Sequence, residues 1–345
     1  MRPDERIGLS GKGVATSAWD LVGNTPLVEL KSLSRKTGCR IMAKCEFMNP
    51  GGSVKDRAAK YMIARAEREG LLKPGGVIVE GTAGNTGIGL ATLAPTRGYR
   101  CIISMPDNQA SEKYAMLEAL GAEVRKVKPV PFANQDHFYH QARRIAENTP
   151  GAYWTDQFEN TANQQAHEEG TGPEIWAQTH GEVDIFTCSV GTGGTMGGVS
   201  RALKSLASQS TTGHEPRIVL ADPAGSGLYC YQREGKIEAT GSSVTEGIGI
   251  MRITANFAGA RIDDAIRISD VEMMDMVFHL AKHEGLFVGT SAGLNVMAAY
   301  RLASAEQGSG KTIVTILCDH GSRYQSKLLS PEWRAEKGFS PKALV

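Results

Sequence analysis

The stretch Val77-Ile78-Val79-Glu80-Gly81-Thr82-Ala83-Gly84-Asn85-Thr86-Gly87 joins a short apolar run to a glycine-rich segment. The apolar run predicts a buried strand over residues 77–80, and residues 88–96 have the composition of a helix. A strand that enters a helix through a glycine-rich turn directs free backbone N–H groups and the helix dipole at an anion. This segment therefore predicts an α/β fold with an anion site at the turn.

A second segment repeats this order. Residues 184–190 predict a strand, Gly191-Thr192-Gly193-Gly194-Thr195-Met196-Gly197-Gly198 follows it, and a helix is expected near residues 199–207. Two hydroxyl-bearing loops of this kind predict two anions, for which a phosphate and a substrate carboxylate are the natural pair. Short apolar strands alternate with helical stretches along the 345 residues, which predicts α/β layers with a largely parallel sheet.

Neither glycine-rich segment fits a nucleotide-binding fingerprint. Met196 stands where the pattern G-x-G-x-x-G requires its third glycine. The segment Gly308-Ser309-Gly310-Lys311-Thr312 resembles the end of a P-loop, but Ala305 replaces the first glycine. It also leads from a helix into a strand expected over residues 312–318, the reverse of the P-loop order. We interpret this segment as a surface turn.

Lys55 lies in the segment Asn49-Pro50-Gly51-Gly52-Ser53-Val54-Lys55-Asp56-Arg57, just before a helix expected over residues 58–70. The Pro-Gly-Gly turn allows the backbone to approach a ligand closely. A partly desolvated lysine has a lowered pKa and can form a Schiff base with an aldehyde cofactor. On this segment alone, an ordinary lysine at a helix N-terminus is an equally good interpretation.

The chain resembles the pyridoxal-phosphate enzymes of the tryptophan-synthase-β type (fold type II), and among them the cysteine synthases, or O-acetylserine sulfhydrylases. The resemblance extends from Asn24-Thr25-Pro26-Leu27-Val28 to Tyr324-Gln325-Ser326-Lys327-Leu328. The motifs that carry it, besides the Lys55 segment and the 82–86 and 191–195 loops, are Asp156-Gln157-Phe158-Glu159-Asn160, Thr171-Gly172-Pro173-Glu174-Ile175-Trp176, Glu246-Gly247-Ile248-Gly249 and Gly289-Thr290-Ser291-Ala292-Gly293.

The resemblance implies a role for each residue of these motifs. Lys55 would bind pyridoxal 5'-phosphate as a Schiff base and then remove the substrate α-proton. The cofactor phosphate would be bound by Gly191, Thr192, Gly193, Gly194 and Thr195. Asn85 would hydrogen-bond the ring hydroxyl of the cofactor, Ser291 would face the pyridine nitrogen, and Gly247 would lie against the ring. The substrate carboxylate would be held by Thr82, Asn85, Thr86 and Gln157, with Ala83 beside it.

A serine rather than an aspartate at the pyridine nitrogen leaves the ring largely neutral, which favours loss of a β leaving group. The resemblance thus implies that O-acetyl-L-serine loses acetate to give an aminoacrylate, to which sulfide adds to form L-cysteine. The alternatives are a cysteine desulfhydrase, which releases sulfide, pyruvate and ammonia, and a cystathionine β-synthase-like activity. A non-catalytic relative is disfavoured because Lys55, Asn85, Gln157 and Ser291 are all present.

Two positions depart from the family pattern. Ala83 stands where relatives commonly have a serine, so one hydroxyl beside the substrate is missing and substrate preference could change. The segment Cys318-Asp319-His320-Gly321-Ser322-Arg323 replaces a serine-rich turn. If the Asp319 carboxylate reached the ring nitrogen or Ser291, the ring would become a stronger electron sink.

The resemblance also implies two lobes. Residues 56–160 would form a smaller, mobile N-terminal lobe that carries the substrate-carboxylate loop. Residues 15–55 and 161–335 would form the larger lobe, with the cofactor in the cleft between the two. Closure of the small lobe on the substrate would exclude water. A homodimer is the family norm, and cysteine synthases often bind the C-terminal tail of serine acetyltransferase.

Composition narrows the class of protein further. The net charge is +1 with no basic run, so nucleic acid is not an expected partner. The first thirty residues contain Asp4 and Glu5 and no apolar segment, so we expect neither a secretory signal nor a membrane anchor, and a cytoplasmic location.

The cysteine and histidine patterns predict no metal site. The six cysteines are scattered without a C-x-x-C pair, and Cys101, Cys188 and Cys318 are expected to be small core residues. His279 and His283 are four residues apart on an expected helix but lack the glutamate of H-E-x-x-H. We expect this pair, and likewise His137 and His140, to lie on solvated helix faces.

Overall fold

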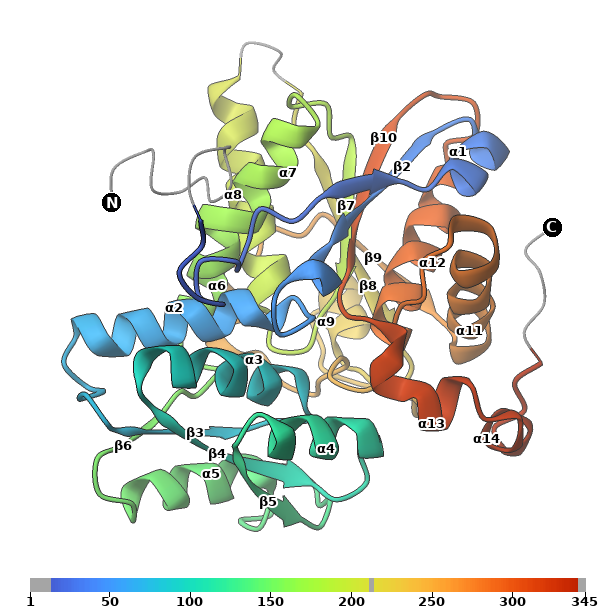
Figure 1. The fold of residues 1–345 in the computed structure, drawn as a ribbon. Coiled ribbons are helices and arrows are strands. Elements are labelled where there is room, and N and C mark those ends of the chain that lie inside the picture. The colour runs from blue at the N-terminus through green and yellow to red at the C-terminus, as the bar shows by residue number, and fades with distance from the viewer. Residues whose placement is uncertain (1–13, 211–213, 341–345) are drawn as a thin grey trace.

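The computed structural model describes residues 14–210 and 214–340, and in it the chain forms two sheets with helices on both faces of each (Figure 1). Asp4 and Glu5, on which the expectation about the N-terminus partly rests, lie outside the described residues. The mixed α/β architecture with mostly parallel strands confirms the predicted fold class.

The larger sheet has six strands in the order β1-β2-β10-β7-β8-β9. β1 pairs antiparallel with β2, whereas every other neighbouring pair is parallel. Most side chains of the central strands β10, β7 and β8 are buried, as expected for a parallel sheet covered on both faces. The strands are β1 (Leu27–Glu29), β2 (Arg40–Cys45), β7 (Ile185–Ser189), β8 (Arg217–Pro223), β9 (Asp264–Ile268) and β10 (Thr312–Leu317).

The smaller sheet has four strands in the order β5-β4-β3-β6, and all of its pairs are parallel. Its strands are β3 (Val77–Gly81), β4 (Arg100–Pro106), β5 (Glu123–Val127) and β6 (Ala152–Trp154). All of them lie within residues 56–160, and the strands of the larger sheet lie outside this range. That the smaller lobe moves remains a prediction.

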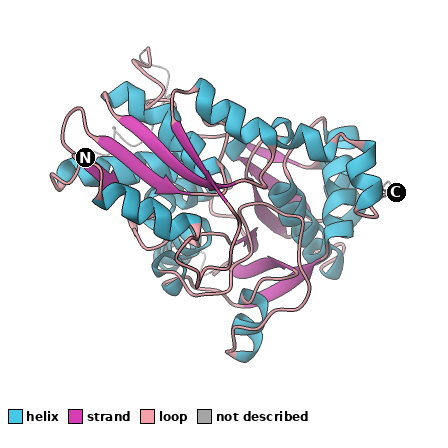
Figure 2. Cartoon of the chain, turned by 90° about the horizontal axis from the view of Figure 1, so that it is seen from below, coloured by secondary structure: helices cyan, strands magenta, loops and turns pink. Residues whose placement is uncertain are grey.

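Helices cover both sheets (Figures 1 and 2). Around the larger sheet, α11 (Asp270–His279) and α12 (Thr290–Ala305) pack on one face, and α7 (Gly172–Gln178) and α8 (Gly194–Gln209) on the other. Around the smaller sheet, α2 (Lys55–Arg68), α3 (Asn85–Leu93) and α4 (Ser111–Ala119) lie opposite α5 (Phe138–Glu147).

The remaining helices are short. They are α1 (Lys31–Thr37), η2 (Glu46–Met48), η3 (Ala94–Arg97), α6 (Ala162–Ala166), η4 (His167–Thr171), α9 (Leu228–Glu234), α10 (Ala255–Ala258), η5 (Leu280–Glu284), η6 (Gly321–Tyr324), α13 (Gln325–Leu328) and α14 (Pro331–Glu336).

Three helices begin earlier than the sequence predicts. α2 begins at Lys55 rather than residue 58, α3 at Asn85 rather than residue 88, and α8 at Gly194 rather than near residue 199. For α8 the reason is the left-handed φ of 91° at Gly193, which ends the turn and lets the helix begin directly after it. The early starts of α3 and α8 bring their N-termini close to the ends of β3 and β7.

The carboxyl ends of β3, β7 and β10 lead into the segments that form the candidate site. β3 runs into the 82–86 loop, β7 into the 191–195 loop, and β10 into Cys318 and Asp319. An isolated bridge between Ser53 and Asp319 attaches the Lys55 turn to the end of β10. Ligands bind at this edge of open α/β sheets because successive loops converge there.

Candidate active site

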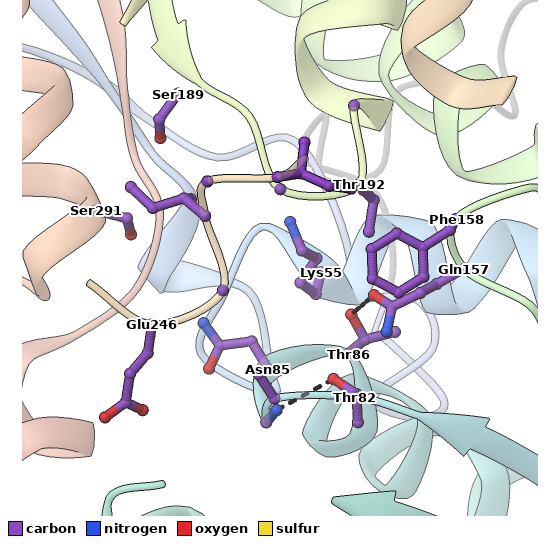
Figure 3. A pocket seen from close by; sticks show the side chains of 18 of the residues that line it. Lys55, Thr82, Asn85, Thr86, Gln157, Phe158, Ser189, Thr192, Glu246 and Ser291 are labelled. Atoms are coloured by element: carbon purple, nitrogen blue, oxygen red, sulfur yellow. Dashed lines mark hydrogen bonds between the residues drawn. The ribbon is translucent and has the colours of Figure 1, made fainter. Parts of the chain in front are cut away.

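A pocket of about 560 Å³ lies where the two sheets meet, within the size range of small-molecule sites (Figure 3). The sequence-predicted residues that line it are Lys55, Thr82, Ala83, Asn85, Thr86, Gln157, Gly191, Thr192, Gly193, Thr195, Gly247 and Ser291. Gly194 is the one predicted residue outside the lining, since it begins α8 directly behind the loop. The pocket thus brings together segments that are far apart in the sequence.

The side chain of Lys55 points into the pocket from the first turn of α2 (Figure 3). Its Nζ atom forms no hydrogen bond or ion pair with any residue in the described part of the chain. Burial lowers the pKa of its amine, and Cys318, Asp319 and Cys188 act in the opposite direction. An amine with a lowered pKa is more often neutral and therefore more nucleophilic.

Buried charges hold the turn that carries Lys55. Asp56 accepts a hydrogen bond from the Gly51 N–H at 2.5 Å. Arg57 donates from Nε to Glu46 at 2.7 Å and from Nη1 to Glu174 at 2.7 Å. Arg57 and the two glutamates satisfy one another inside the protein and Asp56 holds the Gly51 backbone, so the start of α2 has little freedom to shift.

The loop from Gly191 to Thr195 is shaped by close packing. A Cβ atom on Gly191 would lie 2.1 Å from the carbonyl oxygen of Gly247, and one on Gly194 would lie 2.0 Å from Oδ1 of Asn163. Gly193 has a left-handed φ of 91° and no side chain to cap the helix that follows, and the Gly194 N–H makes only a long contact of 3.4 Å with Thr192 Oγ1. The N–H groups of the first turn of α8 can therefore bind an anion in the pocket.

Gly247, unlike Gly191 and Gly194, is not confined by close packing. A Cβ at this position would have no atom of another residue within 4 Å, while its φ is +80°. Packing within the protein therefore does not exclude a side chain here, but the backbone conformation favours glycine.

Polar side chains support this loop from behind. Asn163 donates to Thr192 Oγ1 at 2.9 Å. Nε2 of the fully buried His167 lies 3.3 Å from Thr195 Oγ1, and its Nδ1 lies 2.9 Å from Thr171 Oγ1. Burial, together with the positive charges of Arg57 and Lys55, holds the pKa of His167 well below its usual value, so the ring is neutral.

Hydrogen bonds shape the 82–86 loop. Thr82 Oγ1 accepts from the Gly84 N–H at 3.1 Å, and Thr86 donates to Oε1 of Gln157 at 2.6 Å (Figure 3). Gln157 in turn donates from Nε2 to the Gly81 carbonyl at 2.8 Å. The loop therefore presents two hydroxyls and an amide whose orientations depend on one another.

The Asp319 carboxylate lies beside Asn85, not beside Ser291. Its Oδ2 accepts from Nδ2 of Asn85 at 2.6 Å and from the Tyr324 hydroxyl at 2.6 Å. Ser291 hydrogen-bonds the Cys318 thiol, a contact that opposes the effect of burial, which raises the pKa of this thiol to about 11. Within the described residues, Asp319 forms no hydrogen bond with Ser291, so one of the two contacts through which it would change the ring chemistry is not formed.

The expectation that Cys318 is a core residue is wrong. It is only partly buried and lines the pocket together with the buried Cys188. The position of Cys318 directly after β10 explains this, because side chains at the end of a central strand face the cleft.

Sequence reasoning missed an ion pair across the pocket. Lys113 of α4 is buried and lies 2.5 Å from Glu246, which also pairs with Lys327. The stem of Lys113 packs on Gly84, where an added Cβ would lie 2.5 Å from its Cδ. Glu246 belongs to a motif quoted above, but no local signal identified Lys113.

A second missed group lies at the pocket mouth. The guanidinium of Arg252 lies 4.7 Å, 5.5 Å and 5.1 Å from the ring centroids of Phe132, Tyr139 and Phe158. Arg252 also pairs with Glu159. Cation–π contacts with three rings fix this side chain over the pocket.

Both histidine expectations need correction. His279 is buried, and its Nε2 lies 2.8 Å from Ser32 Oγ of α1. His137 caps α5 and lines the pocket, where burial first and then His140 and Arg252 lower its pKa to about 4. Spacing along one helix could not show that another element covers that face.

The described residues contain neither a candidate metal site nor a candidate membrane-spanning helix. Over residues 14–210 and 214–340, no three His, Cys, Asp or Glu side chains come together in a way that could bind a metal ion. In the same ranges, every helix is too short or too polar to span a membrane.

Comparisons with known proteins agree on one family. Residues 18–319 match the family model described as pyridoxal-phosphate dependent enzyme. The chain is 50% identical over 332 residues to cysteine synthase 1 of Neurospora crassa, covering 95% of this chain and 87% of that protein. It is also 50% identical to cysteine synthase 1 of Emericella nidulans, covering 95% and 88%.

A solved structure shares the fold. The O-acetylserine dependent cystathionine beta-synthase from Helicobacter pylori superposes with a TM-score of 0.81 at 32% identity. The superposition covers 92% of this chain and 99% of that one.

Proposed function

The chain belongs to the pyridoxal-phosphate dependent enzymes, and on this premise we propose that it is a cysteine synthase. It replaces the acetate of O-acetyl-L-serine with sulfide and releases L-cysteine. The observation that carries this proposal is the 50% identity, over 95% of the chain, to proteins named cysteine synthase. The partly buried Lys55 amine in the pocket, whose pKa burial lowers, supports it, because this chemistry needs a nucleophilic lysine.

The pocket residues fit pyridoxal 5'-phosphate. The loop at residues 191–195 packs so closely that Cβ atoms added to Gly191 or Gly194 would collide with neighbouring atoms. It exposes the N-terminus of α8 to the pocket, and a helix N-terminus suits a phosphate. Lys55 and Ser291 line the same pocket as this loop. When bound, the cofactor supplies an aldehyde that condenses with amines and a ring that withdraws electrons from the substrate α-carbon.

Each residue that the sequence singled out has a role in this proposal. The phosphate is held by Gly191, Thr192, Gly193, Gly194 and Thr195, and Gly247 leaves room for the ring. Asn85 donates to the ring oxygen and Ser291 faces the ring nitrogen. The substrate carboxylate is held by Thr82, Asn85, Thr86 and Gln157, and Ala83 lies next to it.

Lys55 has two roles in this proposal. Its amine would hold the cofactor, and the same Nζ is placed to take the substrate α-proton. Burial lowers the pKa of this amine, so a larger share of it is neutral and able to accept a proton. The neutral Ser291 hydroxyl does not stabilise a positive charge on the ring nitrogen, which favours rapid loss of the acetate.

The wider assignments also belong to the proposal. The smaller lobe closes on the substrate and excludes water while the acetate has left and sulfide has not yet added. The protein acts in the cytoplasm as a homodimer, and the cleft can receive the tail of serine acetyltransferase. Support for lobe closure, the homodimer and the serine acetyltransferase tail comes from the family resemblance alone, and the cytoplasmic location rests on the composition of the first thirty residues.

The test is the absorbance of the purified protein with O-acetylserine, followed by sulfide. We expect a long-wavelength band that O-acetylserine produces and that sulfide discharges while cysteine accumulates. Pyruvate release at the same rate with and without sulfide would instead identify a desulfhydrase. Cystathionine formed from homocysteine faster than cysteine from sulfide would identify a cystathionine β-synthase.

Replacement of the lysine tests the central residue. Lys55→Ala should abolish both the visible absorbance of the bound cofactor and the formation of cysteine. Lys60→Ala is a matched control, since Lys60 lies on the same helix but packs over the Trp19 ring. A Lys55→Ala protein that kept the wild-type spectrum would show that another amine binds the cofactor.

A further inference from the structure

The side-chain amide of Asn85 lies between a carboxylate and a guanidinium. Nδ2 donates to Oδ2 of Asp319 at 2.6 Å, and Oδ1 accepts from Nη1 of Arg323 at 2.5 Å. Arg323 is held in place by a second hydrogen bond to the Gly51 carbonyl, and Tyr324 donates to the same carboxylate oxygen at 2.6 Å. Asp319 and Arg323 are both buried.

This arrangement fixes which way the amide faces. If the amide flipped, its oxygen would face the carboxylate and its NH₂ group would face the guanidinium. Both hydrogen bonds would be lost, and each would be replaced by a contact between two acceptors or two donors. In the observed orientation the second N–H of Nδ2 has no hydrogen-bond partner among the residues that the structure describes.

The guanidinium on one side also polarises the amide. Its positive charge at the Asn85 oxygen draws electron density from the NH₂ group and increases the positive charge on the remaining N–H, whereas the carboxylate fixes the direction of that group. Hydrogen bonds in such a chain strengthen one another where water is excluded. The remaining N–H is therefore a stronger donor than that of an ordinary asparagine.

Asp319 is well placed to couple separate parts of the site. Its backbone bridges Ser53 in the Lys55 turn and accepts from the Gly289 N–H at 3.1 Å, two residues before Ser291. The other titratable groups that interact with it are Lys55, Lys113, Cys318 and Tyr324, whereas Arg323 contacts the far side of the Asn85 amide.

We propose that Asp319 and Arg323 are positioning residues for Asn85, which they orient and polarise so that its free N–H stabilises an anionic oxygen on the cofactor ring. This inference rests on the proposed cofactor site. Neither residue touches the cofactor in this account, since both act through the Asn85 amide. The Asp319 position, which departs from the family pattern, thereby acquires a role different from protonation of the ring.

The test compares two replacements of Asp319 that both remove its charge. Asp319→Asn keeps an oxygen that can accept from Asn85, whereas Asp319→Ala keeps none. Each variant is reconstituted with pyridoxal 5'-phosphate alone, and its absorbance is followed against pH, because the colour of the bound cofactor depends on ionisation of its ring oxygen. Loss of the negative charge alone favours the ionised form in both variants equally.

The expected result is a difference between the two variants. In Asp319→Ala the Asn85 amide keeps only its contact with Arg323, so its N–H is held less firmly toward the anionic oxygen, and the midpoint of the colour change lies at higher pH than in Asp319→Asn. We expect a difference of about one pH unit, a tenfold change in the ionisation equilibrium. In an Asn85→Ala background the difference should disappear, because Asp319 acts only through the amide.

Arg323→Lys provides a second test that keeps the charge of the wild type. A single lysine amine cannot reproduce the two hydrogen bonds of Arg323, so the midpoint should again rise relative to wild type. If Asp319→Ala does not fold, as judged by thermal unfolding of the cofactor-free protein, this variant decides alone. Asp222→Ala and Asp222→Asn are the matched controls, since Asp222 is a buried aspartate at the end of β8, outside the pocket lining.

The outcomes separate this inference from the proposed function. Identical pH profiles for Asp319→Ala and Asp319→Asn, including profiles without a transition, overturn the positioning role, as does an Arg323→Lys profile equal to wild type. A difference of the same size between the two Asp222 variants also overturns it. A wild-type protein that does not bind pyridoxal 5'-phosphate would refute the proposed function itself.

Discussion

The two loops that meet in the pocket are held in different ways. The 191–195 loop owes its shape to close packing, because added Cβ atoms at Gly191 and Gly194 would lie 2.1 Å and 2.0 Å from neighbouring atoms. The 82–86 loop owes its shape to polar side chains from other parts of the chain, among them Gln157 and Asp319. Close packing keeps the first loop rigid, whereas the second loop can rearrange when its hydrogen bonds exchange partners.

This difference suits the ligands that we propose for each loop. A cofactor that remains bound through many turnovers is served by a preformed cradle. A substrate that enters and leaves at each turnover is served by groups that can reorient, such as the Thr86 hydroxyl and the Gln157 amide. The predictions below test whether steric changes affect the cofactor and polar changes affect the substrate.

Gly191→Ala should have the largest effect. The new Cβ would collide with the Gly247 carbonyl, which is backbone and cannot move aside cheaply. We expect cofactor affinity to fall at least about a thousandfold, or about 4 kcal/mol, in a fluorescence titration. Gly98→Ala is the control, since an added Cβ at Gly98 would have no atom within 4 Å, although Gly98 has a positive φ of +76° that Gly191 does not share. Cofactor affinity within a factor of three of wild type would contradict the steric account.

The second prediction concerns pH and the buried Asp56, which lies against α3 behind the 82–86 loop. A Cβ on Gly89 of α3 would lie 3.2 Å from its Oδ1. Burial raises the pKa of Asp56 to about 7, with Arg323 and the Gly51 N–H acting in the opposite direction. The folded state therefore keeps a proton between about pH 4 and 7 that the unfolded chain releases.

The sign follows from proton linkage. Between these pH values the folded state binds more protons than the unfolded state, so stability falls as pH rises. Relative to Asp56→Asn, the wild type should lose about 3 to 4 kcal/mol of unfolding free energy from pH 4 to 8. Urea unfolding of the cofactor-free proteins at both pH values measures this loss. Parallel pH profiles for the two proteins would mean that Asp56 is ionised when folded.

Much of this architecture could be predicted from the sequence because its signals are local. A strand, a glycine-rich turn and a helix follow one another within about fifteen residues at both loops, and Lys55 lies in a motif of the same kind. The parallel sheets follow from the alternation of strands and helices. The start of α8 was predicted too late because the left-handed turn at Gly193, after which the helix begins, cannot be seen in the sequence pattern.

The rest depends on contacts between distant residues. Lys113 and Glu246 are 133 positions apart, and Ser32 and His279 are 247 apart. In the sequence, Lys113 cannot be distinguished from other helical lysines, because its partner Glu246 is near it only in the folded chain. The contact between Asn85 and Asp319 likewise joins residues that are far apart in the sequence. The sequence could therefore raise the question of what Asp319 contacts but could not answer it.

Thr86→Val should affect the substrate and spare the cofactor. The replacement keeps the shape of the side chain but removes the hydroxyl that donates to Gln157. We expect the KM for O-acetylserine to rise about ten- to thirtyfold, or about 1.4 to 2 kcal/mol, with cofactor affinity unchanged. Thr92→Val is the control on the same helix, where the hydroxyl bonds the Ile88 carbonyl at 2.8 Å. Equal KM values for the two variants would place the substrate elsewhere.

The smallest expected effect is a loss of stability at acidic pH that arises from His167, behind the 191–195 loop. His167 is buried and neutral next to Thr195, and its pKa is held well below its usual value mainly by burial. Below about pH 6.5 the unfolded chain gains a proton on this histidine that the folded state does not take up, so stability falls as pH falls. From pH 6.5 to 5.5 the wild type should lose about 1 kcal/mol relative to His167→Gln, which can still hydrogen-bond a threonine. Because the loop itself is fixed by packing, cofactor affinity should stay constant over this range. If affinity fell together with stability, the 191–195 loop would depend on its polar support as much as the 82–86 loop does.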